Sequence, residues 1–240
     1  MKATTFICTF TLRLALQKSS SLTLVYVKST FVLKDLGTRY SAHSAYFTAA
    51  NDQIFFALSD DQHGMELWTT DGTPAGTRLV KDINPTGDGL AWAPLVPFGD
   101  YVYFTASETE ENFELWRSDG SAEGTVQVKD LFPGAQGAFP QNLTAYNGNI
   151  YMLTREHELW VTDGTTAGTS KIYDLPNEES TDMDEMAKFG FVPLGEKLLF
   201  TILSIETAEP NRQVIRYGFV WWQTDGTTEG TRMLRSLTGR

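Results

Sequence analysis

The sequence predicts an all-β fold, a β-propeller built from four-stranded antiparallel blades. Three observations favour it: a string repeated four times, hairpin-like alternation before each copy, and no sustained helical periodicity. The string reads ELWTTDGTPAGT from Glu66, ELWRSDGSAEGT from Glu114, ELWVTDGTTAGT from Glu158 and VWWQTDGTTEGT from Val220. Repetition at intervals of roughly 45–60 residues indicates a tandem array whose unit has the size of a propeller blade.

Each unit contains the pattern of four short strands. Residues 96–106, VPFGDYVYFTA, and 144–154, TAYNGNIYMLT, alternate apolar and polar positions on either side of a Gly-containing turn, which predicts hairpins. The ELW stretch is a third strand, DGTxxGT is a turn, and the residues after it form a fourth. We therefore expect a single domain of about five blades, or a fragment of a longer array, with blades at 1–36 (degenerate), 44–83, 92–131, 141–175 and 188–237.

Two residues of the repeat are predicted to be structural. The Trp provides a large apolar anchor between neighbouring sheets. The Asp carboxylate can accept backbone N–H groups of the turn, and the following Gly tolerates a positive φ. One carboxylate per turn is too few for calcium, which takes six to eight oxygens. These repeat residues are Trp68, Trp116, Trp160 and Trp222, with Asp71, Asp119, Asp163 and Asp225.

The repeated string resembles the ELWxxDGT repeat family, bacterial propeller-like proteins of mostly undefined role. The resemblance covers about residues 31–237. The fourth copy departs from the pattern, because Val220-Trp221 replaces Glu-Leu and Ser236 replaces a recurring Asp. Membership would imply a secreted or surface protein, and we accordingly expect an extracellular, cell-surface or periplasmic location.

Composition excludes several classes of protein. A net charge of −11 and a pI near 4.7 argue against a nonspecific nucleic-acid binder, which needs a basic surface. There is no apolar run of transmembrane length, and the single cysteine, Cys8, cannot form an intramolecular disulfide. Residues 1–17 could be a signal peptide, but Arg13 interrupts the apolar stretch and the alternation around it predicts a strand.

The variable segments are expected on one face. The strands of a blade run alternately in opposite directions. The tight turns that join strands one and two (1→2) and strands three and four (3→4) therefore share one face. The links from strand two to strand three (2→3), and from strand four to the first strand of the next blade (4→1), share the other face. Nearly half of the acidic residues fall on these links, which predicts either a solvated rim or a site for cations or basic partners. The links 176–190 and 202–218 should meet there in one acidic patch. Its calcium candidates are Glu178, Glu179, Asp182, Asp184 and Glu185, and its further binding candidates are Glu206, Glu209 and Arg212.

No catalytic constellation is recognisable in the sequence. The strands expected around the central axis contain no Asp or Glu, which a propeller glycosidase would need there. His43, His63 and His157 occupy unrelated repeat positions, so zinc is not expected. We therefore predict a non-enzymatic, monomeric module for binding, adhesion or surface scaffolding. It should bind a protein or a glycan on the acidic loop face and should need no cofactor unless calcium binds. The alternatives are a five-bladed propeller glycoside hydrolase or lyase, and a purely structural spacer.

Overall fold

The described part of the protein is entirely β. The computed structural model describes residues 7–18, 21–32, 47–60, 62–91, 93–134, 136–176, 190–207 and 215–238. Regular structure within these ranges consists of strands, and the predicted all-β class is confirmed. The described residues contain no helix long and apolar enough to cross a membrane.

Four four-stranded antiparallel sheets, here called blades one to four, follow one another along the chain. In every blade the strands pair in chain order, and each blade contains one copy of the repeated string. Blade one comprises β3 (Thr48–Ala50), β4 (Gln53–Asp60), β5 (Gly64–Thr70) and β6 (Arg78–Lys81). Blade two comprises β7 (Val96–Phe98), β8 (Tyr101–Ala106), β9 (Glu114–Ser118) and β10 (Val126–Lys129). Blade three comprises β11 (Gln141–Tyr146), β12 (Asn149–Leu153), β13 (Glu158–Thr162) and β14 (Ser170–Asp174), and blade four β15 (Val192–Leu194), β16 (Lys197–Thr207), β17 (Ile215–Thr224) and β18 (Arg232–Thr238).

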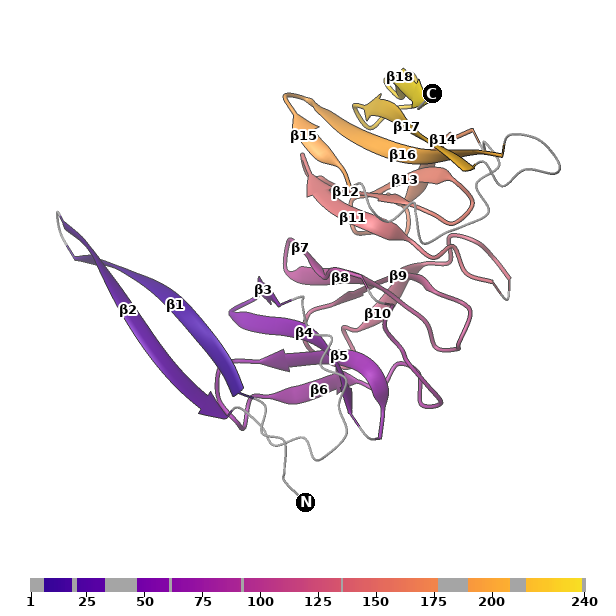
Figure 1. Ribbon diagram of the computed structural model, residues 1–240. Coiled ribbons are helices and arrows are strands. Elements are labelled where there is room, and N and C mark those ends of the chain that lie inside the picture. The colour runs from indigo at the N-terminus through magenta and orange to yellow at the C-terminus, as the bar shows by residue number, and fades with distance from the viewer. Residues whose placement is uncertain are drawn as a thin grey trace.

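The N-terminal region differs from the expected fifth blade. Strands β1 (Ile7–Lys18) and β2 (Ser21–Val32) pair along their whole length and form a two-stranded sheet. This hairpin projects away from the four blades (Figure 1). Residues 1–36 contain no Gly, Pro or Asn, so the sequence lacks the turn residues that would divide it into four short strands. Among the residues that the structure describes there are therefore four blades, and the predicted count of five is corrected.

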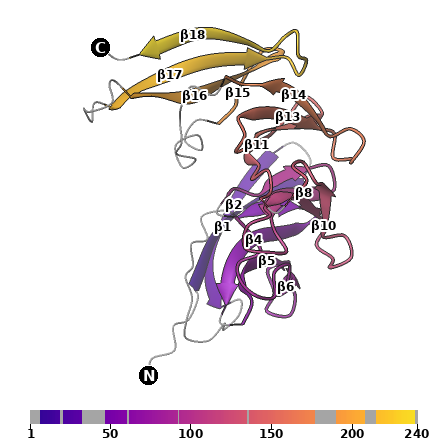
Figure 2. The ribbon, with the colours of Figure 1, turned by 90° about the vertical axis from the view of Figure 1, so that its right-hand side faces the viewer.

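The blades stack face to face in an arc (Figures 1 and 2). The first strands β3, β7 and β11 contact one another in succession, as expected for the inner edge of a propeller. We call the face that a blade turns toward the next one its forward face, and the opposite face its rear face. Buried apolar clusters fill the three interfaces. In the first, Phe55, Leu67 and Val80 on the forward face of blade one pack with Val102, Phe104 and Trp116 on the rear face of blade two.

In blades two to four the repeated Trp lies in these interfaces and is contacted by the preceding blade. Trp116 is 3% exposed, and the Lys81 ammonium of blade one lies 5.3 Å from its ring centroid. Lys129 takes the same position over Trp160, at 5.9 Å. In blade three the equivalent residue is Tyr173, whose ring centroid lies 5.7 Å from that of Trp222. A cation–π or aromatic contact thus accompanies apolar burial at each interface.

The DGTxxGT turn is held by side chains inside the turn. In blade two, Asp119 Oδ1 accepts the Ser121 backbone N–H at 2.8 Å and the Ser121 hydroxyl at 2.7 Å. Ser121 Oγ then accepts the Gly124 N–H at 2.9 Å. A Cβ at Gly124 would lie 2.1 Å from Asp119 Oδ1, which explains why the repeat has a second glycine. The same bonds recur in the other three turns, and the bonds from Ser121 lower the pKa of Asp119.

The long link expected over residues 202–218 is largely regular structure. Strand β16 continues to Thr207 and β17 begins at Ile215, and the two pair from Leu198↔Thr224 to Thr207↔Ile215. Apolar and β-branched residues alternate with other residues in both segments, so they extend the central hairpin of blade four instead of forming a loop.

Candidate functional site

The first residue of the ELW string holds a link of the variable face in place. Glu114 is fully buried, and its carboxylate accepts backbone N–H groups of Leu131 at 3.0 Å and of Ala138 at 2.9 Å. These two residues stand at the two ends of the link between blades two and three. One side chain therefore fastens both ends of that link, and Phe132 N–H adds a longer bond of 3.4 Å.

The same link packs closely against the end of the 2→3 link of blade two. A Cβ on Gly137 would lie 2.4 Å from the Phe113 carbonyl oxygen, so only glycine fits there. The Phe139 N–H donates to that carbonyl at 2.9 Å. Phe139 itself has a φ of 49°, a left-handed conformation that bulky residues rarely adopt and that costs conformational energy. This backbone places its ring edge-on to Phe113, with centroids 5.2 Å apart.

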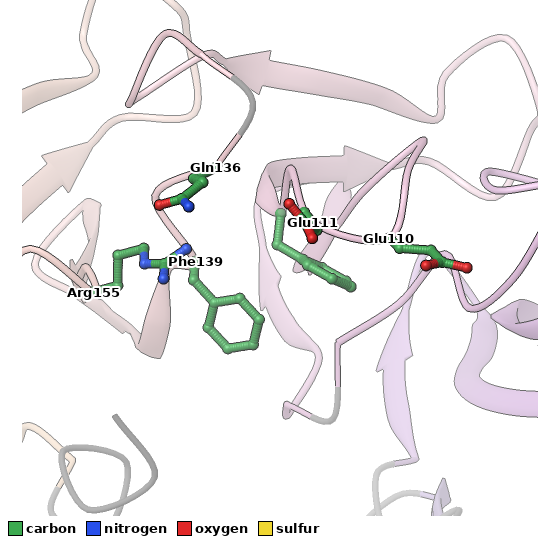
Figure 3. A pocket seen from close by; sticks show the side chains of 6 residues that line it. Glu110, Glu111, Gln136, Phe139 and Arg155 are labelled. Atoms are coloured by element: carbon green, nitrogen blue, oxygen red, sulfur yellow. The ribbon is translucent and has the colours of Figure 1, made fainter. Parts of the chain in front are cut away.

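The two phenylalanines are part of an open pocket of about 340 Å³ between blades two and three. Figure 3 shows Arg155 and Gln136 on one side of the pocket and Glu110 and Glu111 on the other, with the ring of Phe139 between them. Arg155 follows β12, and its backbone N–H donates to Ala138 at 2.9 Å. The lining thus comes from three links of the variable face, brought together by Glu114 and Gly137.

The lining combines an apolar surface with several polar groups. The aromatic rings offer a flat surface, Gln136 and Arg155 offer N–H donors, and the glutamates and the Gln136 carbonyl offer acceptors. The volume falls in the range of about 300–1,000 Å³ typical of small-molecule sites. Charged residues nearby, such as Glu108 and Glu156, are exposed and add to the negative character of this face. The pocket can therefore bind a ligand with one apolar face and several hydrogen-bonding groups.

Blade one also has a buried Glu at the start of its ELW string, Glu66, which has fewer hydrogen bonds than Glu114. Glu66 is also fully buried and accepts the Asn84 N–H at 2.9 Å, while its Oε2 has no hydrogen-bond partner among the described residues. Burial raises the pKa of Glu66 to about 7, against the lowering effect of the Asn84 and Ile83 N–H groups. Burial also raises the pKa of Glu114, which backbone N–H groups of Ala138, Leu131 and Phe132 oppose.

The repeated Glu has another role in blade three and is replaced in blade four. Glu158 accepts the Lys171 ammonium at 2.8 Å and the Trp160 Nε1–H at 2.8 Å. Blade four has Val220 at the equivalent position, 7% exposed in the apolar cluster it shares with blade three. The sequence showed this Glu in three of four copies, but its function in holding the links was not recognised.

Most residues of the acidic patch predicted from the sequence lie outside the residues that the structure describes. Glu178, Glu179, Asp182, Asp184, Glu185, Glu209 and Arg212 lie outside the described residues. Glu206 belongs to β16, where its backbone pairs with Arg216. The proposal that these residues form one calcium or partner site therefore stays a prediction. The pocket at Phe113 and Phe139 was not predicted, although its lining residues lie on the variable links that were expected to share one face.

The described histidines have local partners or are buried. His63 Nδ1 lies 2.9 Å from the Asp60 carboxylate, and this hydrogen bond raises the pKa of His63. His157 is buried, which lowers the pKa of its imidazole. His43 lies outside the described residues. In the ranges that the structure describes, no three His, Cys, Asp or Glu side chains converge as metal ligands would.

The likeness to one solved structure supports the fold, and the comparisons assign no function to this chain. No family model matches the chain, and no curated protein sequence matches it. A crystal structure of a puromycin hydrolase mutant is similar over 86% of this chain, with a TM-score of 0.51 and 15% identity, and the chain spans 30% of that protein. An alpha-L-arabinofuranosidase from Clostridium thermocellum has a TM-score of 0.40 and 13% identity over 80% of this chain and 71% of that one. The Bacteroides ovatus xyloglucan PUL protein GH43B has the same TM-score, 0.40, and identity, 13%, over 79% of this chain and 40% of that one.

Proposed function

We propose that this protein is a propeller-type binding module that holds a sugar residue of a glycan in the pocket at Phe113 and Phe139. The observation that carries the proposal is the pair of aromatic rings beside hydrogen-bonding groups in one open pocket. The C–H face of a pyranose packs on an aromatic ring, and its hydroxyls require donors and acceptors around the rim. Gln136, Arg155 and the two glutamates supply both kinds of group.

The strain at Phe139 supports the same proposal. A positive φ at a bulky residue persists only where the surroundings enforce it, and such residues are concentrated at functional sites. Here the surroundings are the Glu114 carboxylate and the close contact at Gly137. The ring is thus held in place before a ligand arrives, which reduces the entropy cost of binding.

Glycoside hydrolysis is the second candidate function. It is favoured by one observation, the two carboxylates of Glu110 and Glu111 in the lining of the pocket, because glycosidases act with a pair of carboxyl groups. Against it, the inner strands β3, β7, β11 and β15 contain no Asp or Glu. Binding without turnover is therefore the preferred proposal.

A glycan array followed by titration calorimetry tests both candidates. We expect a specific glycan to bind, and Phe139→Asn to weaken it by about tenfold or more, since Asn tolerates the left-handed backbone but lacks the ring. Phe132→Asn is the matched control, because Phe132 lies on the same link, is 40% exposed and does not line the pocket. Equal affinity of wild type and Phe139→Asn would refute the site. Release of chromophore from an aryl glycoside, lost in Glu110→Gln or Glu111→Gln, would establish the hydrolase instead.

A further inference from the structure

The forward face of blade four is apolar and exposed, although the same positions are buried in the other blades. On the third strand, Leu67, Leu115 and Leu159 are each 0% exposed, whereas the equivalent Trp221 is 42% exposed. On the fourth strand, Val80, Val128 and Ile172 are 5%, 5% and 8% exposed, whereas Leu234 is 45% exposed. The next blade covers the first three faces.

The inner strand of blade four shows the same difference. Val192 and Leu194 of β15 are 60% and 63% exposed. Their equivalents in β7, Val96 and Phe98, pack against the cluster shared by blades two and three. Together these positions make an apolar sheet face that runs from β15 to β18. A contiguous apolar face differs from the singly scattered hydrophobic residues that are normal on a protein surface.

Basic residues on this face repeat those that join blade one to blade two. Arg78 donates to the Gly120 carbonyl at 2.6 Å, and Lys81 donates to the Thr125 carbonyl at 3.1 Å while lying over Trp116. Both carbonyls belong to the DGTxxGT turn of the next blade. Alignment of the repeats places Arg232 at the position of Arg78 and Arg235 at the position of Lys81, and both arginines are exposed.

We propose that the forward face of blade four is a docking surface for one further blade of the same repeat type, stacked on it as blade two stacks on blade one. The Trp of that blade would pack beside Trp221 and beneath the Arg235 guanidinium. The carbonyls of its DGTxxGT turn would accept hydrogen bonds from Arg232 and Arg235. The proposal rests on continuity with the three interfaces already present and is independent of the pocket at Phe139.

A second copy of this chain fits the surface less well. The rear faces of blades two to four are covered by the preceding blades. On the rear face of blade one, Phe56 is 4% exposed and Trp68 is 3% exposed, so they are buried too. Two forward faces packed together would bring Arg232 and Arg235 of both copies into one interface, where like charges repel. A blade with a free rear face avoids both difficulties.

The test supplies such a blade on the full array. The chain is extended after Leu237 by a second copy of residues 84–131, because Leu237 aligns with Ile83 and the link then keeps its register. Hydrogen exchange is followed by mass spectrometry in peptides from β17 and β18 and in the added segment. We expect exchange in β17 and β18 to slow by about tenfold or more, and the added blade to resist a protease that cleaves unfolded chains.

Two controls make the outcome decisive. Trp221→Arg in the extended chain should abolish both the protection and the protease resistance, while the far-ultraviolet circular dichroism of the unextended variant stays unchanged because Trp221 is exposed and lies outside the inter-blade clusters. An added segment that is cleaved rapidly and leaves β17 and β18 unprotected overturns the proposal. Concentration-dependent dimers of the unextended chain in sedimentation velocity, lost in Trp221→Arg, would assign the face to a second copy and overturn it as well.

Discussion

The carboxylate of Glu114 accepts a 2.9 Å hydrogen bond from the backbone N–H of Ala138, at the far end of the link that separates blades two and three. The same carboxylate holds Leu131 at the near end. The first residue of β9 thus determines the shape of a loop on the surface. Because Phe139 directly follows Ala138, the geometry of the pocket depends on this buried side chain.

Removing the Glu114 carboxylate should destabilise the protein. Glu114→Ala leaves the buried N–H groups of Leu131 and Ala138 without acceptors, and we expect a loss of about 3 kcal/mol in the free energy of unfolding. Glu114→Gln retains one carbonyl oxygen and should lose less. Urea unfolding monitored by Trp fluorescence measures both, with the exposed Glu108→Ala as control. A Glu114→Ala variant as stable as Glu108→Ala would contradict this role.

Glu66 should make stability depend on pH. In the unfolded chain its carboxyl loses a proton near the usual pKa of 4.5, whereas the folded protein keeps it up to about 7. The folded state binds more protons in that window, so the free energy of unfolding should fall as pH rises from about 4.5 to about 7, by about 3 kcal/mol, and stay level above it. Glu66→Gln should not show this decrease in the free energy of unfolding.

The measurement is a comparison of urea unfolding at pH 5 and pH 8 for wild type and Glu66→Gln. The other titrating groups are common to both proteins, and their contribution cancels in the difference. We expect the variant to gain stability relative to wild type at pH 8. An equal pH dependence in the two proteins would mean that folding does not raise the pKa of Glu66.

Two tryptophans in different surroundings, the repeated Trp116 in blade two and the exposed Trp221 in blade four, should contribute very differently to stability. Trp116→Ala removes a side chain that is 3% exposed in the first interface, and we expect a loss of about 3–5 kcal/mol. Trp221→Ala, at the 42% exposed neighbour of the repeated Trp in blade four, should lose about 1 kcal/mol or less. Equal shifts in the denaturant midpoint would show that Trp221 is covered in solution.

Asp119 and Gly124 should be coupled in a double-mutant cycle. Asp119→Ala removes two hydrogen bonds in the turn and should lose about 1–2 kcal/mol. Gly124→Ala should be costly in wild type, because its Cβ would lie 2.1 Å from Asp119 Oδ1, and much less costly once that carboxylate is absent. Additive losses in thermal unfolding would show that the turn relaxes around the added methyl group. Asp100→Ala, in the exposed turn between β7 and β8, is the control.

The turns and blades were predictable because their determinants are local. Asp119, Ser121 and Gly124 interact within six residues, and the hairpins alternate around their own turn residues. The role of Glu114 was missed because its partners lie on a distant link, and a single sequence gives no sign of which N–H groups a buried carboxylate will meet. The repetition of Glu in three copies was the available signal.

The pocket and the length of blade four depend on longer-range effects. Phe139 has a left-handed backbone because of contacts at Gly137 and Ala138, and its own side chain argues against that conformation. The segment 202–218 was expected to be a link because the repeat spacing is longer there. Its strand propensity was the better guide, since β16 and β17 continue the pairing of the shorter hairpins.

The anchoring of a link by one carboxylate at both ends has a use in protein engineering. Between Leu131 and Ala138 the chain runs through exposed residues such as Phe132, Pro133 and Gly134, and Glu114 holds this segment through backbone N–H groups and not through side chains. Foreign peptides could be grafted into this segment with their ends held at a fixed separation. Blade two would then serve as a display scaffold in which the buried Glu114 defines the insertion point.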